Sequence, residues 1–326
     1  MNLTVDSAFS GVVSIAKDYN TIFRAAYGCA DKPNNVPNEP DTRFGTASAG
    51  KAFVATAVLR LIEQGRLTLG SRLGDLLDLD LRRIDPGVTV RQLLNHTSGI
   101  PDYFDESVMS EYEELWVDVP NYRIRQSTDV LPLFIDKPMM YPAGERFQYN
   151  NSGYVVLGLI LEAVTGLPFD EHLKRAVFEP CGMASTGYYE LDRLPAKCAN
   201  SYIYDAGRGE YRTNIYSIDA KGTGAGGAFT TAPDVERFWH GLLTGRLLDP
   251  DTLALMLAPQ AGGGCYGYGV WLIDADTPSF QGCDPGANFF TAYHRARGLS
   301  VTILSNIDYD VEALYGTLCA QLPASL

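Results

Sequence analysis

The sequence predicts an α/β fold of the α+β type, in which both ends of the chain build one lobe and a mainly helical lobe is inserted between them. Three observations predict it. β-rich runs lie near both termini, helical patterns fill the middle, and 326 residues are more than one compact core usually holds but too few for three domains. We expect residues 1–70 and 225–326 to form the α/β lobe and residues 71–224 the helical lobe.

The N-terminal part of the chain predicts a β-hairpin followed by a long helix. Residues 10–16 and 21–27 are β-rich, and the polar residues 17–20 between them are typical of a turn. From residue 48 to residue 64 apolar side chains recur at helical spacing, and Gly65 is expected to end the helix as a C-terminal cap.

The rest of the chain predicts short helices first and strands last. Helical patterns occupy residues 153–165 and 169–177. Thr231, Pro233 and Asp234 form a typical helix start, with a capping hydroxyl, an early proline and an acidic third position. The remaining expected elements are β-rich runs at 268–274, 287–295 and 299–307 and a final amphipathic helix at 311–322.

Composition disfavours several classes of partner. Lys and Arg total 26 against 39 Asp and Glu, so the formal net charge of −13 would repel nucleic acid. No stretch approaches the roughly 18 apolar residues that span a bilayer, so we expect no membrane partner. The first ten residues lack a secretory pattern, which makes a cytoplasmic location the expectation.

Cysteines and histidines do not suggest a metal or a cofactor. The six cysteines are widely spaced, without a CxxC pair, and we interpret them as mostly reduced thiols. The four histidines stand at no metal-ligand spacing, so we expect no metal site. Residues 222–227 formally match the dinucleotide fingerprint, but no apolar strand precedes them and the next helix starts late, so no cofactor is expected.

Ser48 and Lys51 are the first candidate pair for chemistry. They are three residues apart at the start of the predicted helix, so their side chains share one face. Apolar residues follow Lys51 directly, and desolvation would lower the pKa of its amine and make it a usable base toward the Ser48 hydroxyl. The same spacing recurs at Ser14 and Lys17, but on a strand residues three apart point to opposite faces.

Tyr149 and Asn151 are the second candidate pair. In an extended segment, residues two apart can present a phenol and an amide to the same cleft. A phenol near a lysine ammonium would have a lowered pKa and could shuttle protons. The competing interpretation is a tyrosine-rich loop that only caps the following helix. For His96 we favour a structural role in a turn over a catalytic one.

Taken in order, several segments resemble the serine β-lactamase and penicillin-binding protein superfamily, nearest to its class C β-lactamase, carboxylesterase and D-aminopeptidase branch. Residues 9–13 resemble its opening strand and residues 44–69 its nucleophile helix. The most specific matches are residues 93–101 (LLNHTSGIP), 147–154 (FQYNNSGY) and 226–234 (GGAFTTAPD). The resemblance implies a β-lactamase/transpeptidase-like fold, with an antiparallel sheet flanked by helices and an active site in the cleft between the lobes.

The resemblance also implies roles for individual residues. Ser48 corresponds to the acylated nucleophile and Lys51 to its activating partner. Tyr149 corresponds to the general base or acid, and Asn151 to the amide that contacts Lys51 and the substrate. The backbone N–H groups of Ser48 and Cys283 are the expected oxyanion hole, which requires no particular side chain.

The third motif of the family departs from its usual form. It consists of Lys or His, then Ser or Thr, then Gly, and the turn at 284–286 (DPG) places it at Phe280, Gln281 and Gly282, the expected substrate-binding segment. Losing a charge-assisted contact to a substrate carboxylate costs about 1.5–3 kcal/mol. We therefore expect weak β-lactamase activity, unless Arg295 or Arg297 supplies the missing cation.

The leading interpretation is a serine hydrolase that acts through an acyl-enzyme on Ser48 and cleaves a small ester or amide. Its partner is a small-molecule substrate, whose pockets the loop at residues 103–122 is expected to shape. A catalytically weak ligand-binding or sensor module and an acyltransferase that uses the same residues remain alternatives, and the sequence does not set the oligomeric state.

Overall fold

The two ends of the chain meet in one antiparallel sheet. The computed structural model describes residues 3–260 and 264–323. The main sheet has six strands in the order β2-β1-β12-β11-β10-β9, and every neighbouring pair is antiparallel. Its strands are β1 (Gly11–Lys17), β2 (Asn20–Tyr27), β9 (Trp271–Leu272), β10 (Pro278–Asp284), β11 (Ala287–His294) and β12 (Leu299–Ser305). The N-terminal hairpin therefore lies beside the C-terminal strands, which confirms the predicted sheet.

The edge of this sheet next to β9 differs from the sequence prediction. The run predicted at 268–274 pairs as a strand only at Trp271 and Leu272. Gly269 has a φ of +74° and passes so close to the helix below that an added Cβ would lie 2.5 Å from the Cβ of Ala55. The backbone around Gly269 packs onto the helix that contains Ala55. This packing, rather than pairing with a neighbouring strand, sets the path of residues 268–270.

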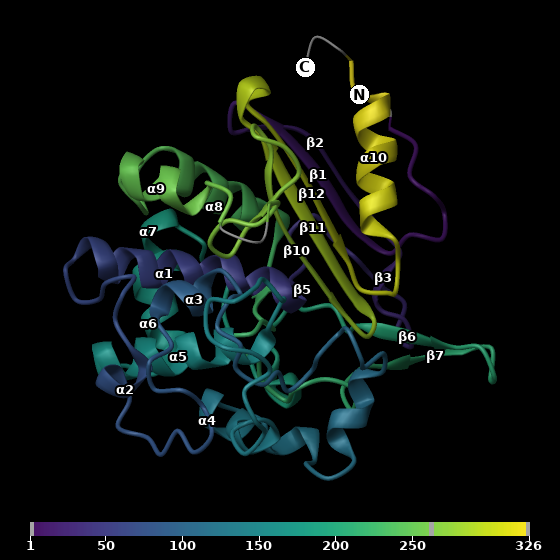
Figure 1. The fold of residues 1–326 in the computed structure, drawn as a ribbon. Helices are drawn as coiled ribbons and strands as arrows, with labels where there is room; N and C mark the ends of the chain where they lie inside the picture. Colours follow the sequence, from purple (N-terminus) through teal and green to yellow (C-terminus); the bar gives the residue numbers. More distant parts are fainter. Residues whose placement is uncertain (1–2, 261–263, 324–326) are drawn as a thin grey trace.

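Helices cover both faces of the sheet (Figure 1). On one face lies α10 (Val311–Gln321), whose buried side chains join a cluster with apolar residues of β1, β11 and β12. On the other face lie α8 (Ala232–Leu243) and α1 (Lys51–Glu63), which belong to the larger core. The helix predicted to start at Thr231 is confirmed, because the Thr231 hydroxyl accepts a hydrogen bond from the backbone N–H of Asp234.

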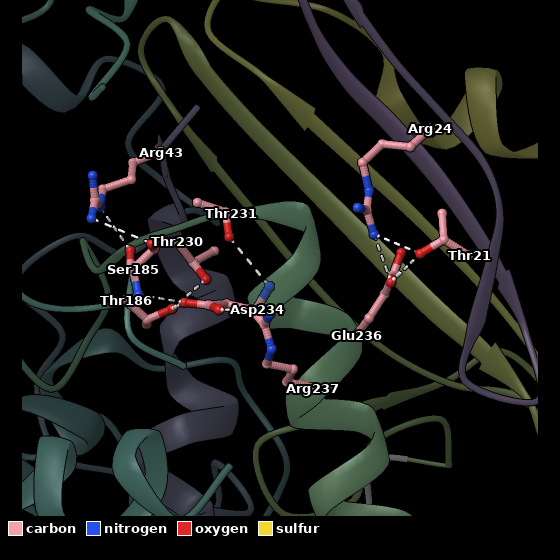
Figure 2. A network of polar contacts seen from close by, with 10 residues as sticks. All are labelled: Thr21, Arg24, Arg43, Ser185, Thr186, Thr230, Thr231, Asp234, Glu236 and Arg237. Carbon is pink, nitrogen blue, oxygen red and sulfur yellow. Dashed lines mark hydrogen bonds and ion pairs between the residues drawn. The ribbon is translucent and has the colours of Figure 1, made fainter. Parts of the chain in front are cut away.

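Two polar networks fix α8 in this position (Figure 2). The buried carboxylate of Asp234 accepts hydrogen bonds from the backbone N–H of Ser185 at 2.8 Å and from the hydroxyl of Thr186 at 2.9 Å. Glu236 pairs with Arg24 of β2 at 2.7 Å. One helix is thus joined both to the sheet and to the segment around Ser185 and Thr186 in the middle of the chain.

The middle of the chain supplies mostly helices, with α5 at their centre. The helix predicted at 153–165 begins two residues earlier, since α5 spans Asn151–Thr165 and the Asn150 side chain accepts from the Gly153 N–H at 2.7 Å. Its neighbours are α2 (Leu73–Leu76), α3 (Val90–Leu94), α4 (Ser127–Val130) and α6 (Phe169–Leu173). The short helix α7 (Glu179–Cys181) packs against α8, and α9 (Pro250–Met256) follows α8. The helix predicted at 169–177 is divided, because a π-helical turn at Lys174–Phe178 separates α6 from α7.

Three short strand pairs complete the fold. They are β3 (Cys29–Asp31) with β4 (Val36–Pro37), β5 (Phe44–Gly45) with β8 (Phe229–Thr230), and β6 (Tyr202–Asp205) with β7 (Glu210–Thr213). In Figure 1 the hairpin of β6 and β7 projects from the body of the molecule. Among the described residues no single helix is long and apolar enough to cross a bilayer. The pair formed by α5 and the segment Phe169–Cys181 reaches that length and apolar composition only when its two parts are added together, and they are bent by 80° relative to each other.

Candidate active site

Ser48 lies in a short turn at the entrance to α1. The turn is a 3-10 helix at Ala47–Gly50, and α1 proper begins at Lys51. Ala47 has a φ of +46°, an unusual conformation for a residue with a side chain. Gly282 of β10 lies directly against this turn, where an added Cβ would be 2.5 Å from the backbone nitrogen of Ser48. The backbone around Ser48 is therefore held closely from the sheet side.

Lys51 is buried and makes three contacts at the start of α1. Its Nζ lies 2.9 Å from the Ser48 hydroxyl, 2.9 Å from the side-chain oxygen of Asn151 and 2.5 Å from the carbonyl of Ala225. Burial lowers the pKa of Lys51 to about 8, while the carboxylates of Glu106, Asp102 and Asp284 oppose this decrease. The desolvation predicted from the apolar residues that follow Lys51 is confirmed.

Asn151 reaches Lys51 from the first turn of α5. It therefore starts a helix instead of lying in the extended segment that the sequence suggested, and that prediction is wrong. Its backbone N–H donates to Asp102 at 2.9 Å, and its side-chain nitrogen donates to the carbonyl of Phe104 at 3.2 Å. Asp102 is buried and also accepts from the N–H of Ser152, so it caps the positive end of α5 and orients the amide that faces Lys51.

Tyr149 stands beside Ser48 and Lys51, with its ring held between aromatic neighbours. Its ring stacks on Trp271 at 5.9 Å, and the Nζ of Lys51 lies 5.0 Å from its centroid. Burial, and then the nearby Tyr266, raise the pKa of Tyr149 well above its ordinary value, and a hydrogen bond with Ser48 opposes this rise. The expected lowering of the phenol pKa by Lys51 is therefore wrong, because desolvation outweighs the attraction of one ammonium.

His96 occupies a turn behind Tyr149. It has a φ of +58°, is fully buried, and its Nδ1 accepts a hydrogen bond from the backbone N–H of Asn150 at 3.0 Å. Burial and the charge of Lys51 hold the pKa of His96 well below its ordinary value, so the imidazole is neutral. This geometry agrees with the structural role that we favoured from the sequence.

The glycine-rich segment before β8 has a use that the sequence did not reveal. We rejected a dinucleotide fingerprint at residues 222–227, and the structure shows instead that this segment packs against the nucleophile turn. An added Cβ on Gly226 would lie 2.3 Å from the carbonyl oxygen of Ala47. This close approach brings the carbonyl of Ala225 to Lys51, so the glycines serve backbone packing.

The third motif lies on β10, but its first residue is not in a cavity. Phe280 is 1% exposed and packs among the rings of Phe53, Phe238, Trp239 and Phe289. Our prediction that Phe280 contacts substrate is corrected, since its side chain belongs to the core below the site. Gln281, Gly282 and Cys283 do line a cavity beside Ser48.

Neither arginine considered as a substitute cation reaches the site. Arg295 and Arg297 lie in a turn at the end of β11, where Arg295 faces Asp276 at 3.9 Å. Neither lines the two cavities beside Ser48. Of the described residues that line those cavities, the one Lys or Arg is Arg212, which pairs with Glu113 at 2.7 Å.

Ser48 lines two cavities. The smaller, which we call the inner cavity, has a volume of about 190 Å³ and is lined by Ser48, Asn151, Tyr103, Tyr112, Asp219 and Asp284, among others. The larger, which we call the outer groove, has a volume of about 760 Å³ and includes Ser48, Tyr149, Trp271 and Gln281 in its wall. Two cavities that both include Ser48 suit a substrate with a group on each side of the reacting bond.

Several acidic side chains lie at this junction, and the sequence did not single them out. Glu106 and Asp284 line both cavities, and Asp219 lines the inner one. Burial raises the pKa of Asp284 to about 6 and that of Asp219 to about 7. No spacing in the chain links these residues, so only the fold could show that they are neighbours. No group of three or more His, Cys, Asp or Glu in the described part of the chain is arranged to hold a metal ion.

Comparison with known proteins agrees with this geometry. The family model named Beta-lactamase matches residues 4–318. The chain is 27% identical to the putative penicillin-binding protein PbpX of Bacillus subtilis (94% of this chain, 73% of the relative), and 27% identical to the esterase EstB of Burkholderia gladioli (92% and 86%). A crystal structure of a penicillin-binding protein from Bacillus halodurans is 38% identical, with a TM-score of 0.92 over 97% of this chain and 98% of that one. The chain thus belongs to the Beta-lactamase family of serine hydrolases.

Proposed function

We propose that the protein hydrolyses a small ester or amide through an acyl-enzyme formed on Ser48. The observation that carries the proposal is the convergence of Ser48, Lys51, Tyr149 and Asn151 at the junction of two cavities. The relatedness to an esterase supports ester substrates.

Lys51 is the base that this arrangement favours. With a pKa of about 8, about one tenth of the Lys51 side chains are neutral at pH 7. A neutral Lys51 accepts the proton of the Ser48 hydroxyl, and the Ser48 oxygen then forms a bond to the substrate carbonyl carbon. The Tyr149 phenol keeps its proton because its pKa is raised, so Tyr149 is suited to protonate the leaving group and to recover its proton from Lys51.

The developing oxyanion would be stabilised by backbone groups. Among the described residues, β9 pairs with Pro278 and Ser279 of β10 only, so residues 280–284 of β10 present an edge without a strand partner to the site. Cys283 lies on that edge and lines both cavities with Ser48. The N–H groups of Ser48 and Cys283 are our proposed oxyanion hole. Water then attacks the acyl carbonyl, the acid leaves, and Ser48 recovers its proton.

β-Lactams are expected to be poor substrates. A β-lactam carries a carboxylate, and the position where the family places a cation is occupied by the buried ring of Phe280. The negative charges of Glu106 and Asp284 would also oppose that carboxylate.

The proposal is tested by the turnover of p-nitrophenyl butyrate by wild type and by Ser48→Ala, with circular dichroism as the test of folding. We expect the folded variant to lose at least about a hundredfold of the wild-type rate. Equal rates in both proteins would contradict the proposal.

A further inference from the structure

A third cavity, whose walls do not include Ser48, adjoins the outer groove. It has a volume of about 290 Å³ and lies where α10 meets β9 and β10. Three residues, Trp271, Gln281 and Glu312, line both the outer groove and this third cavity, so the two spaces are adjacent. The other described residues in its walls are Cys265, Leu272, Ile273, Ser279, Phe290 and Tyr315.

One face of β10 leads from Ser48 to the third cavity. Residues two apart on a strand share a face, so Ser279, Gln281 and Cys283 form one row along β10. Cys283 lines both cavities beside Ser48, and Gln281 lines the outer groove and the third cavity. Ser279 lines the third cavity alone. At about 3.4 Å per residue the row is roughly 14 Å long. An extended ligand that follows this row reaches from Ser48 to the third cavity.

The leaving group is the part of the substrate that enters the outer groove. Tyr149 lines the outer groove and is not among the described residues that line the inner cavity. Under the proposed function Tyr149 protonates the leaving group, and a proton donor must lie within hydrogen-bond reach of the atom that it protonates. The acyl group of the substrate then occupies the inner cavity, and a long leaving group extends along the row on β10.

The walls of the third cavity favour an uncharged, largely apolar group. The rings of Phe290 and Tyr315 lie 4.6 Å apart between β11 and α10. Ser279 is 1% exposed, and its hydroxyl has no hydrogen-bond partner within the described part of the chain. Buried hydroxyls normally have a partner, so this one is available to a polar atom of a ligand. The one carboxylate among the described wall residues belongs to Glu312, which is exposed and already accepts a hydrogen bond from Gln281 at 3.0 Å.

We propose that the third cavity binds the distal end of the leaving group, so that the preferred substrates are esters of long, uncharged and largely apolar alcohols. An extended octyl chain spans most of the row on β10, and a hydroxyl at its far end would meet Ser279. This inference rests on the proposed function, because the alcohol is placed relative to the ester bond that Ser48 attacks.

Two isomeric esters test on which side of the ester bond the long chain binds. Octyl butyrate and butyl octanoate have the same composition, but the octyl chain belongs to the alcohol in the first and to the acid in the second. We expect kcat/KM, measured by titration of the released acid, to be at least about tenfold higher for octyl butyrate, because burial of a few methylenes contributes tenfold or more. Equal values, or a preference for butyl octanoate, would overturn the proposal.

A pair of variants locates the long chain. Ile273→Asp puts a charge in the wall of the third cavity at a side chain that is 49% exposed, and it should lower the preference for octyl butyrate by about fivefold or more. Val36→Asp in β4 is the matched control, because Val36 is 48% exposed and lines none of the three cavities. A preference that persists in Ile273→Asp, or that falls equally in both variants, would overturn the assignment to the third cavity.

Binding of a diol tests the cavity without turnover. In calorimetric titrations with 1,8-octanediol, we expect Ser279→Ala to bind about threefold to tenfold more weakly than wild type, because the variant loses one neutral hydrogen bond. Equal affinity in wild type, Ser279→Ala and Ile273→Asp would overturn the proposal. The two failures are distinguishable, since absence of Ser48-dependent hydrolysis contradicts the proposed function, whereas diol binding is measured independently of hydrolysis.

Discussion

The nucleophile centre and the inner cavity beside it are built from the chain in different ways. The centre takes Ser48 and Lys51 from one helical turn and Tyr149 and Asn151 from another segment, so each pair is local in sequence. The carboxylates of the inner cavity come from isolated positions, with Asp219 in a loop and Asp284 at the end of β10. Relatedness therefore informs the reaction chemistry at the centre, but it says less about these wall residues, which belong to no motif.

The largest effect on the rate should come from replacing Lys51, the general base of the nucleophile centre. Lys51→Met keeps most of the buried side-chain volume but removes the amine that contacts Ser48 at 2.9 Å. We expect kcat/KM for p-nitrophenyl butyrate to fall by about 10²–10⁴, the usual contribution of a positioned base. A folded variant with a rate within tenfold of wild type would show that Lys51 is not the base. The contrast between a nucleophile centre built from local motifs and a cavity wall built from isolated residues would then no longer hold.

The next effect tests whether a cation could simply be restored to the third motif. Phe280→Lys would bury an ammonium among four aromatic rings, because Phe280 lies in the core. We expect a loss of at least about 3 kcal/mol in the free energy of unfolding, measured by denaturant titration, since the buried charge has no partner. A stable variant that is acylated by a β-lactam would show that this position belongs to the site.

Gly282→Ala tests the contact between β10 and the nucleophile turn. Its Cβ would lie 2.5 Å from the Ser48 nitrogen, so Ser48 must move, and a displacement of about 1 Å can cost a hundredfold in rate. Gly316→Ala in α10 is the matched control, because an added Cβ there meets nothing within 4 Å. Activity assays and thermal unfolding of both variants should show a loss of rate in the first only. Equal rates would mean that the turn is less constrained than the distances indicate.

The smallest effect is a shift in the pH profile of kcat/KM, because Asp284 of the cavity wall changes the pKa of Lys51 at the nucleophile centre. With a neutral ester, kcat/KM should rise as pH passes through about 8, because the base is the neutral form of Lys51. The carboxylate of Asp284 raises the pKa of Lys51, so Asp284→Asn should move the midpoint to lower pH. A profile that is flat through pH 8, or a midpoint that moves upward in the variant, would contradict this electrostatic account.

Sequence predicted most of the fold and the centre of the site because both leave local signals. Apolar periodicity located α1 and α5, and the spacing of Ser48 and Lys51 at a helix start placed both side chains on one face. The sheet could be expected because its strands lie at both ends of the chain.

The parts that sequence did not predict depend on contacts between distant segments. Asp102 acquires its role only because α5 begins beside it, 49 residues later in the chain. The raised pKa of Tyr149 follows from burial among aromatic side chains, which no local pattern reports. The DPG turn placed Phe280 at the first position of the third motif, but the packing below β10 determined that its side chain joins the core.

The most direct test of the central claim is to identify the residue that carries the acyl group. Wild-type protein would be quenched rapidly in acid during turnover of p-nitrophenyl butyrate, digested and mapped by mass spectrometry. We predict one butyryl group, located on Ser48, and none on that peptide in Ser48→Ala. Turnover without an acylated Ser48, or acylation of Tyr149 instead, would contradict it.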